Sequence, residues 1–168
     1  MTTLNKYELT KETLKFDKNF KKDFDIIISE GESNEFDRTT TMTITNDNEG
    51  KIYVRANWSN LSTSDQDFAT LIISETDKLF FGAKFYWGII DLKQKKIDRL
   101  ENCELFWTFE KHGDIIVVIT ELLAKSIDLN GEVIDEVPID PPFESKDFKD
   151  RIEFQSPVYG RQTLKLLK

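Results

Sequence analysis

Cysteine and histidine are almost absent from this chain of 168 residues, which contains one of each. Cys103 cannot form an intramolecular disulfide on its own, and Cys103 and His112 together are too few ligands for structural zinc. A Ser-His-Asp triad would have to use His112, which we expect at an exposed hairpin tip, whereas we expect Cys103 to be a buried, inert thiol. The composition therefore predicts no metal site and no enzymatic activity.

Long apolar runs and glycine-rich loops are also missing. The longest apolar runs, 79–83 and 115–119, are far shorter than the roughly 20 residues that cross a bilayer. Residues 1–6 lead directly into charged side chains, without the apolar core of a signal peptide. No Walker or dinucleotide-binding glycine pattern occurs. We therefore expect a cytoplasmic protein that binds neither a membrane nor a nucleotide cofactor.

Basic side chains are in deficit, with 23 Lys and Arg against 31 Asp and Glu and a formal net charge of -8. This sign opposes binding to a phosphate backbone, so we expect a basic macromolecular partner and no direct contact with nucleic acid. Residues 1–22 are the exception, because they contain six Lys and three acids. We expect this basic N-terminal segment to be partly flexible.

Aromatic residues, in contrast, are plentiful. The chain has 13 Phe, 4 Tyr and 3 Trp, enough bulk for the core of one domain over residues 1–168 without disulfides. Two clusters, 80–87 and 106–109, alternate along predicted strands, and we expect both faces of these strands to be covered. If one face is open instead, Trp58 and Tyr86 are the candidate anchors for a partner or a sugar.

Short segments rich in β-branched and aromatic residues predict strands, and no long helical period competes with them. In the first half of the chain they are 13–16, 24–29, 39–45, 51–56 and 68–73. The polar segment 46–50 predicts a hairpin loop. A calcium loop is disfavoured, because Trp58 stands where such a loop needs a bidentate carboxylate.

An internal repeat is the most informative pattern in the sequence. Ile90-Asp91-Leu92 recurs as Ile127-Asp128-Leu129, so the period is 127 − 90 = 37 residues, and each copy predicts four consecutive strands. In the second copy Asn130-Gly131 predicts a two-residue hairpin turn with positive φ at both positions. Four-stranded units of this length are typical of propeller blades. The fold class is therefore all-β, an antiparallel meander of about ten to thirteen strands closed as a sandwich, a barrel or a small propeller-like disc.

Three prolines lie close together in the last part of the chain. Pro138, Pro141 and Pro142 donate no ladder hydrogen bonds, which predicts a long surface connection over 137–147. Two final strands are expected at 151–155 and 160–166, and the alternative for 146–151 is a single helical turn.

Acidic residues gather in two blocks, 23–37 and 128–144, each with six acids and no Lys or Arg. Such a block is either a solvated face or a docking surface that steers a cationic partner. We take the second block as the candidate partner-binding surface. Its acids are Asp128, Glu132, Asp135, Glu136, Asp140 and Glu144.

The acidic segment Ile127-Asp128-Leu129-Asn130-Gly131-Glu132-Val133-Ile134-Asp135-Glu136-Val137, in a small acidic β protein, resembles bacterial immunity proteins of contact-dependent growth inhibition and related polymorphic toxin systems. The resemblance implies a cytoplasmic protein that binds one cognate toxin domain, often a nuclease, and blocks its active site or substrate groove. We therefore expect an inhibitor that neutralises a basic toxin domain stoichiometrically through charge complementarity.

Two alternative functions use other residues. Trp58, Tyr86 or Trp107 is a candidate stacking platform for a carbohydrate-binding module. A glycoside-processing β-domain would need two carboxylates about 5 to 9 Å apart, for which Glu104, Glu110 and Glu121 are the candidates.

Overall fold

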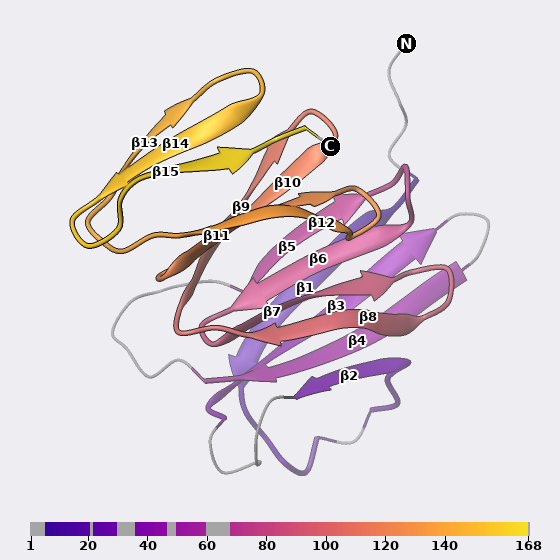
Figure 1. Ribbon diagram of the computed structural model, residues 1–168. Coiled ribbons are helices and arrows are strands. Elements are labelled where there is room, and N and C mark those ends of the chain that lie inside the picture. Colours follow the sequence, from indigo (N-terminus) through magenta and orange to yellow (C-terminus); the bar gives the residue numbers. More distant parts are fainter. Residues whose placement is uncertain (1–5, 21, 30–35, 47–49, 60–67, 168) are drawn as a thin grey trace. The chain divides into compact units, whose positions relative to one another are not determined.

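The computed structural model describes residues 6–20, 22–29, 36–46, 50–59 and 68–167. Within these ranges the regular structure consists of fifteen β-strands in four sheets and no helix, which confirms the all-β class with two strands more than the upper expectation (Figure 1). The strands are β1 (Glu8–Lys15), β2 (Ile26–Ser29), β3 (Arg38–Asn46), β4 (Gly50–Trp58), β5 (Ala69–Ile73), β6 (Lys78–Ala83), β7 (Tyr86–Asp91), β8 (Lys96–Asn102), β9 (Phe106–His112), β10 (Ile115–Thr120), β11 (Leu123–Asp128), β12 (Val133–Pro138), β13 (Glu144–Asp147), β14 (Arg151–Ser156) and β15 (Gly160–Lys165).

Contacts divide the chain into two compact units. The first comprises residues 1–84 and 88–100, and the second comprises residues 85–87 and 101–168. The expectation of one domain over residues 1–168 stays a prediction. No helix among the described residues is long and apolar enough to cross a bilayer.

The first sheet has the strand order β1-β3-β4-β2, with β2 parallel to β4 and the other pairs antiparallel. The alternating side chains of β4 explain why one face of this strand lies against the core. Ile52, Val54, Ala56 and Trp58 point to that face and are buried there. The predicted strand at 13–16 exists but begins earlier, at Glu8. The hairpin predicted at 46–50 is formed by β3 and β4, and its loop residues 47–49 lie outside the described residues.

The second and third sheets confirm the internal repeat. Their strand orders are β5-β6-β7-β8 and β12-β11-β10-β9, so each copy of the repeat is one four-stranded meander. The four strands begin at 69, 78, 86 and 96 in the first copy and at 106, 115, 123 and 133 in the second, a constant offset of 37 residues. The central strands are the most buried: Leu79 to Ala83 in β6 and all of β7 are shielded from solvent. Burial of the 80–87 cluster is therefore confirmed, except at Phe85, which is half-buried.

The hairpin turn of the second copy differs from the prediction. The N–H of Gly131 donates to the carbonyl of Asp128 at 3.0 Å, so Leu129 and Asn130 are the central residues of the turn. Gly131, at φ +93°, follows them in the left-handed region, and Asn130 has no positive φ. In the first copy, which has no glycine there, Lys95 takes a positive φ of 53°. One left-handed residue therefore suffices in each turn.

The fourth sheet, β13-β14-β15, corrects the reading of the proline-rich segment (Figure 1). Residues 137–147 are not one surface connection, because Ile139 is fully buried and residues 144–147 form β13. The single helical turn considered for 146–151 is likewise absent, since β13 extends to Asp147. Ile139 lies in a core cluster with side chains of the third and fourth sheets, including Val117 and Phe154. The two final strands are confirmed as β14 and β15.

Candidate partner-binding surface

Two aspartates of the candidate surface bind backbone N–H groups of their own unit. Asp128 Oδ1 accepts the N–H groups of Asn130 and Glu132, both at 2.9 Å, and so stabilises the β11–β12 turn. Asp135 Oδ2 accepts the N–H of Lys165 at 2.9 Å and links β12 to β15. These carboxylates act first as structural acceptors, a role that the acidic pattern alone does not reveal.

Asp140 has the same kind of role at the β14–β15 hairpin. Its carboxylate, 9% exposed, accepts the N–H of Val158 at 3.1 Å and the N–H of Tyr159 at 3.4 Å. Hydrogen bonds to a charged acceptor are stronger than neutral ones, so this contact holds the hairpin tip in place.

The three glutamates of the set keep solvent exposure. Glu132 and Glu144 are exposed, and the side chain of Glu136 is 57% exposed although its Oε2 lies 3.5 Å from the Lys125 ammonium. The set extends along the whole of β12, because Glu132 precedes this strand and Asp140 follows it. In the other acidic block, Asp25 accepts the N–H of Tyr53 at 2.7 Å, and residues 30–35 lie outside the described residues.

Trp58 and Tyr86, the candidate aromatic anchors for the case that one strand face is open, are both buried, as expected if both faces are covered. Trp58 is 3% exposed, and its indole N–H donates to Thr40 Oγ1 at 3.0 Å, because position 58 falls on the core face of β4. Tyr86 is 2% exposed, because β7 is a central strand covered on both faces.

Trp107, the third candidate stacking platform, remains available at 36% exposed. Its ring stacks on Phe143, with centroids 5.4 Å apart and an interplanar angle of 19°. Phe143 in turn meets the buried ring of Phe154 edge-on at 5.6 Å. The indole is therefore fixed against the core of the second unit. The sequence offered Trp107 only as a sugar platform, and nothing in it indicated the contact with Phe143, 36 residues away.

A nearly buried ion cluster lies in the first unit. The Lys78 ammonium contacts Asp91 Oδ2 at 2.9 Å and Asp98 Oδ2, and Asp91 Oδ1 also accepts the N–H of Gln94 at 2.7 Å. Burial alone would lower the pKa of Lys78, but hydrogen bonds to Asp98 and Asp91 outweigh it and raise that pKa. Burial would raise the pKa of Asp91, yet Lys78 and backbone N–H groups hold it below its ordinary value.

These shifts predict how stability depends on pH. Because the pKa of Asp91 is lowered by folding, its stabilising contribution is complete above the ordinary value of 3.8 and is lost as pH falls through the lower folded-state value. The raised pKa of Lys78 acts in the opposite sense, so its contribution is lost as pH rises through a value above 10.5. We expect Asp91→Asn to flatten the acid limb of a melting-temperature profile, whereas Asp114→Asn, at an exposed turn, leaves it unchanged. An unaltered acid limb in Asp91→Asn contradicts this assignment.

The remaining candidate chemistry is sparse. His112 is partly buried, and its Nε2 lies 3.5 Å from Glu110 Oε2, a contact between neighbours on one strand. Cys103 is partly exposed, which corrects the expectation of a buried thiol, because it lies in the connection before β9 and not in a central strand. Glu104 and Glu110 are exposed. Among the described residues, no three His, Cys, Asp or Glu side chains are grouped to hold a metal.

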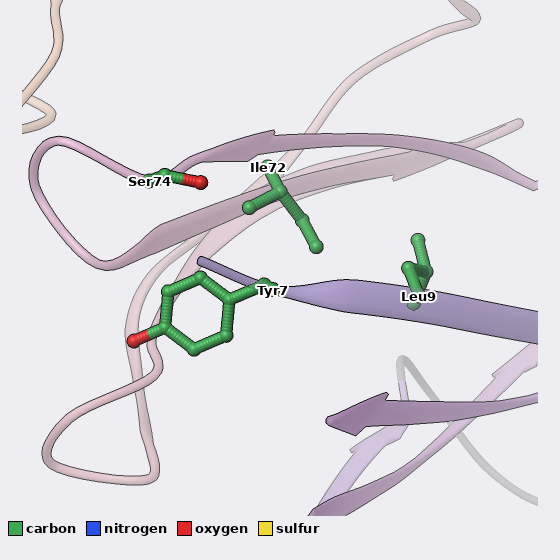
Figure 2. A pocket seen from close by; sticks show the side chains of 4 residues that line it. All are labelled: Tyr7, Leu9, Ile72 and Ser74. Carbon is green, nitrogen blue, oxygen red and sulfur yellow. The ribbon is translucent and has the colours of Figure 1, made fainter. Parts of the chain in front are cut away.

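A small hollow lies between β1 and β5 in the first unit, lined by Tyr7, Leu9, Ile72 and Ser74 (Figure 2). Its volume is about 270 Å³, just below the roughly 300–1,000 Å³ of typical ligand pockets. The Tyr7 hydroxyl points away from Ile72 and donates to Asp77 Oδ1 at 2.8 Å (Figure 2). Burial, together with this carboxylate, raises the pKa of Tyr7, so the phenol stays neutral. The hollow therefore offers apolar contact but no reactive pair.

No family model and no curated protein matches this chain. Among solved structures it is similar to the β-propeller domain of the trilobed protease from Pyrococcus furiosus, with a TM-score of 0.51 and 12% identity over 96% of this chain and 54% of that chain. It also matches Hsv2 from Kluyvelomyces marxianus with a TM-score of 0.37 and 12% identity over 73% and 46% of the two chains. The chain thus spans about half the length of these structures. The constant strand offset, the four-stranded meanders and the first of these matches together show an all-β fold of the propeller-like kind.

Proposed function

We propose that this protein binds a basic toxin domain, expected to be a nuclease, and neutralises it stoichiometrically by blocking its active site or substrate groove. The observation that carries the proposal is the net charge of -8 combined with glutamates of the second acidic block that remain exposed, Glu132, Glu136 and Glu144. Carboxylates presented this way attract the Lys and Arg side chains with which a nuclease holds phosphates. The resemblance to immunity proteins supports the same function and implies a cytoplasmic inhibitor that needs no cofactor.

Charge reversal at two exposed glutamates, Glu132 before β12 and Glu136 on it, tests the proposal. We expect Glu132→Lys combined with Glu136→Lys to slow association with the toxin domain about tenfold at low salt, because steering depends on the local field. The toxin domain to use is the one that the resemblance predicts beside this gene, and stopped-flow association at several salt concentrations is the measurement.

The matched control reverses two exposed glutamates on β1, Glu8→Lys with Glu12→Lys, which changes the net charge equally. We expect this control to retain fast association, and thermal unfolding should show both variants folded. Association that does not depend on salt, or equal slowing in both variants, contradicts the proposed surface. A toxin that stays active at equimolar inhibitor contradicts the proposed function.

The second candidate function is carbohydrate binding, and one observation favours it: of the three proposed platforms, Trp107 keeps an exposed ring while Trp58 and Tyr86 are buried. Saturable binding of an oligosaccharide that is lost in Trp107→Ala would support this function. The glycoside-processing alternative requires turnover that is lost in Glu104→Gln or Glu110→Gln.

A further inference from the structure

Four chain segments of the second unit meet at one end of the third sheet, where β9 and β11 begin and β10 and β12 end. The N–H of Glu121 donates to the carbonyl of Leu105 at 2.8 Å, and the N–H of Ile139 donates to the carbonyl of Leu122 at 3.1 Å. Stacking of Trp107 on Phe143 adds the start of β13, and Asp140 adds the β14–β15 hairpin tip. We call this region, residues 103–107, 120–123, 138–145 and 156–160, the hairpin end.

Exposed apolar side chains are concentrated at the hairpin end. Trp107 is 36% exposed, Leu122 39%, Val158 74% and Tyr159 43%. Pro141, Pro142 and Pro157 are exposed beside them. Exposed apolar groups on segments that meet at one end of a sheet are typical of a protein–protein contact.

The hairpin end is also rigid, as anchors of a binding surface need to be. Trp107 is stacked on Phe143, which packs on the core, and the backbone of Val158 and Tyr159 is held by the Asp140 carboxylate. Large side chains that are already ordered lose little conformational entropy when a partner binds, so they contribute strongly to affinity.

The charges of the hairpin end favour a basic partner. The four segments contain no Lys, Arg or His, although Lys146 and the exposed Arg161 follow two of them directly. Besides the inward-facing Asp140 they carry three acids, Glu104, Glu121 and Glu144. The nearby Lys146 has its ammonium 5.1 Å from the ring of Phe148, outside the hairpin end. An exposed indole attracts guanidinium and ammonium groups through its π-face, and acids on the same segments add a favourable negative field.

We propose that the hairpin end is the central docking surface for a basic protein partner, with Trp107 and Tyr159 as anchors and with Glu104 and Glu144 orienting the partner's Arg or Lys side chains. This inference rests on the proposed function and deepens it. It adds an apolar anchor at one end of the third sheet to the glutamates near the β11–β12 turn, which steer association.

The experiment titrates the full-length, ¹⁵N-labelled protein with a hexa-arginine peptide and follows backbone amides and the three tryptophan indoles by NMR. We expect the Trp107 indole and the amides of Val158 and Tyr159 to shift saturably. The indoles of Trp58 and Trp87, both buried, are internal controls that stay unmoved. Trp107→Ala should weaken binding about tenfold, as for an aromatic anchor.

Two double variants that each remove two negative charges distinguish binding at the hairpin end from binding near the β11–β12 turn. Glu104→Gln with Glu144→Gln, both at exposed positions that should not disturb folding, is expected to weaken hexa-arginine binding about fivefold. Glu132→Gln with Glu136→Gln removes the same charge elsewhere and should change the affinity less than twofold.

Two other results overturn the inference. Shifts confined to residues near Glu132 and Glu136 would place cation binding at the other end, with the proposed function intact. Shifts of the Trp107 indole with cellohexaose but not with hexa-arginine would assign the surface to a glycan. Failure of the proposed function is distinguishable, since it appears as an active toxin at equimolar inhibitor whether or not hexa-arginine binds at the hairpin end.

Discussion

Replacing Gly88 by alanine is expected to destabilise the protein by about 3 kcal/mol. Gly88 lies in the interior of β7, where a Cβ atom would approach the Arg99 carbonyl oxygen to 2.3 Å and Phe81 Cζ to 2.5 Å. Neither neighbour can move easily, because one is backbone and the other is a fully buried ring. The added methyl group must therefore separate β7 from its neighbours or displace the ring, and urea unfolding measures the cost.

Gly160→Ala is the matched control. Gly160 has φ +63° at the start of β15, and a Cβ there would meet no atom within 4 Å. The only penalty is the strain of a left-handed alanine, about 1 kcal/mol. If both variants lose the same stability, close packing at position 88 is not what selects glycine. The other copy of the repeat has the long side chain of Lys125 at the equivalent position, 88 + 37 = 125, so this close approach belongs to one copy only.

Lys78→Met should also destabilise the protein by about 3 kcal/mol. The ammonium lies between Asp91 and Asp98, and the side chains of Lys78 and Asp91 are only 13% and 11% exposed. Methionine has similar bulk but no charge, so the two carboxylates would remain close together without their shared cation. Removing one partner of a buried ion pair costs more than the pair itself contributes, because the remaining charge is poorly solvated.

Lys96→Met is the comparison for this second variant. The Lys96 ammonium lies 3.6 Å from Asp98 Oδ1, but its side chain is 55% exposed, so we expect a loss below about 0.5 kcal/mol. The double variant Lys78→Met with Asp91→Asn should recover part of the loss, because the asparagine oxygen can still accept the N–H of Gln94 while the repulsion between Asp91 and Asp98 is gone. Equal losses in the two lysine variants would show that burial of the ion cluster is unimportant.

The Asp that recurs in both copies of the repeat stabilises a turn. The sequence pattern alone does not distinguish this structural role from a role in partner binding. Asp91 and Asp128 stand at the same repeat position, and each uses its Oδ1 to accept backbone N–H groups of the turn that follows. Position 78 differs between the copies, because Ile115 replaces the lysine in the second. The second copy therefore has no cation at position 115, and Asp128 is half-buried where Asp91 is buried, yet both carboxylates serve the turn. An acidic residue that begins a turn is best assigned to the turn first.

The all-β class, most strand positions and the repeat of 37 residues are readable from the sequence, because side-chain alternation and turn-forming residues act over only a few neighbouring positions. Which charged and aromatic side chains face solvent depends instead on how the strands pack. The core face of β4 buries Trp58, the Lys165 N–H binds Asp135, and Phe143 fixes Trp107 at the surface. Each of these outcomes depends on a group far away in the chain, so no local pattern carries it.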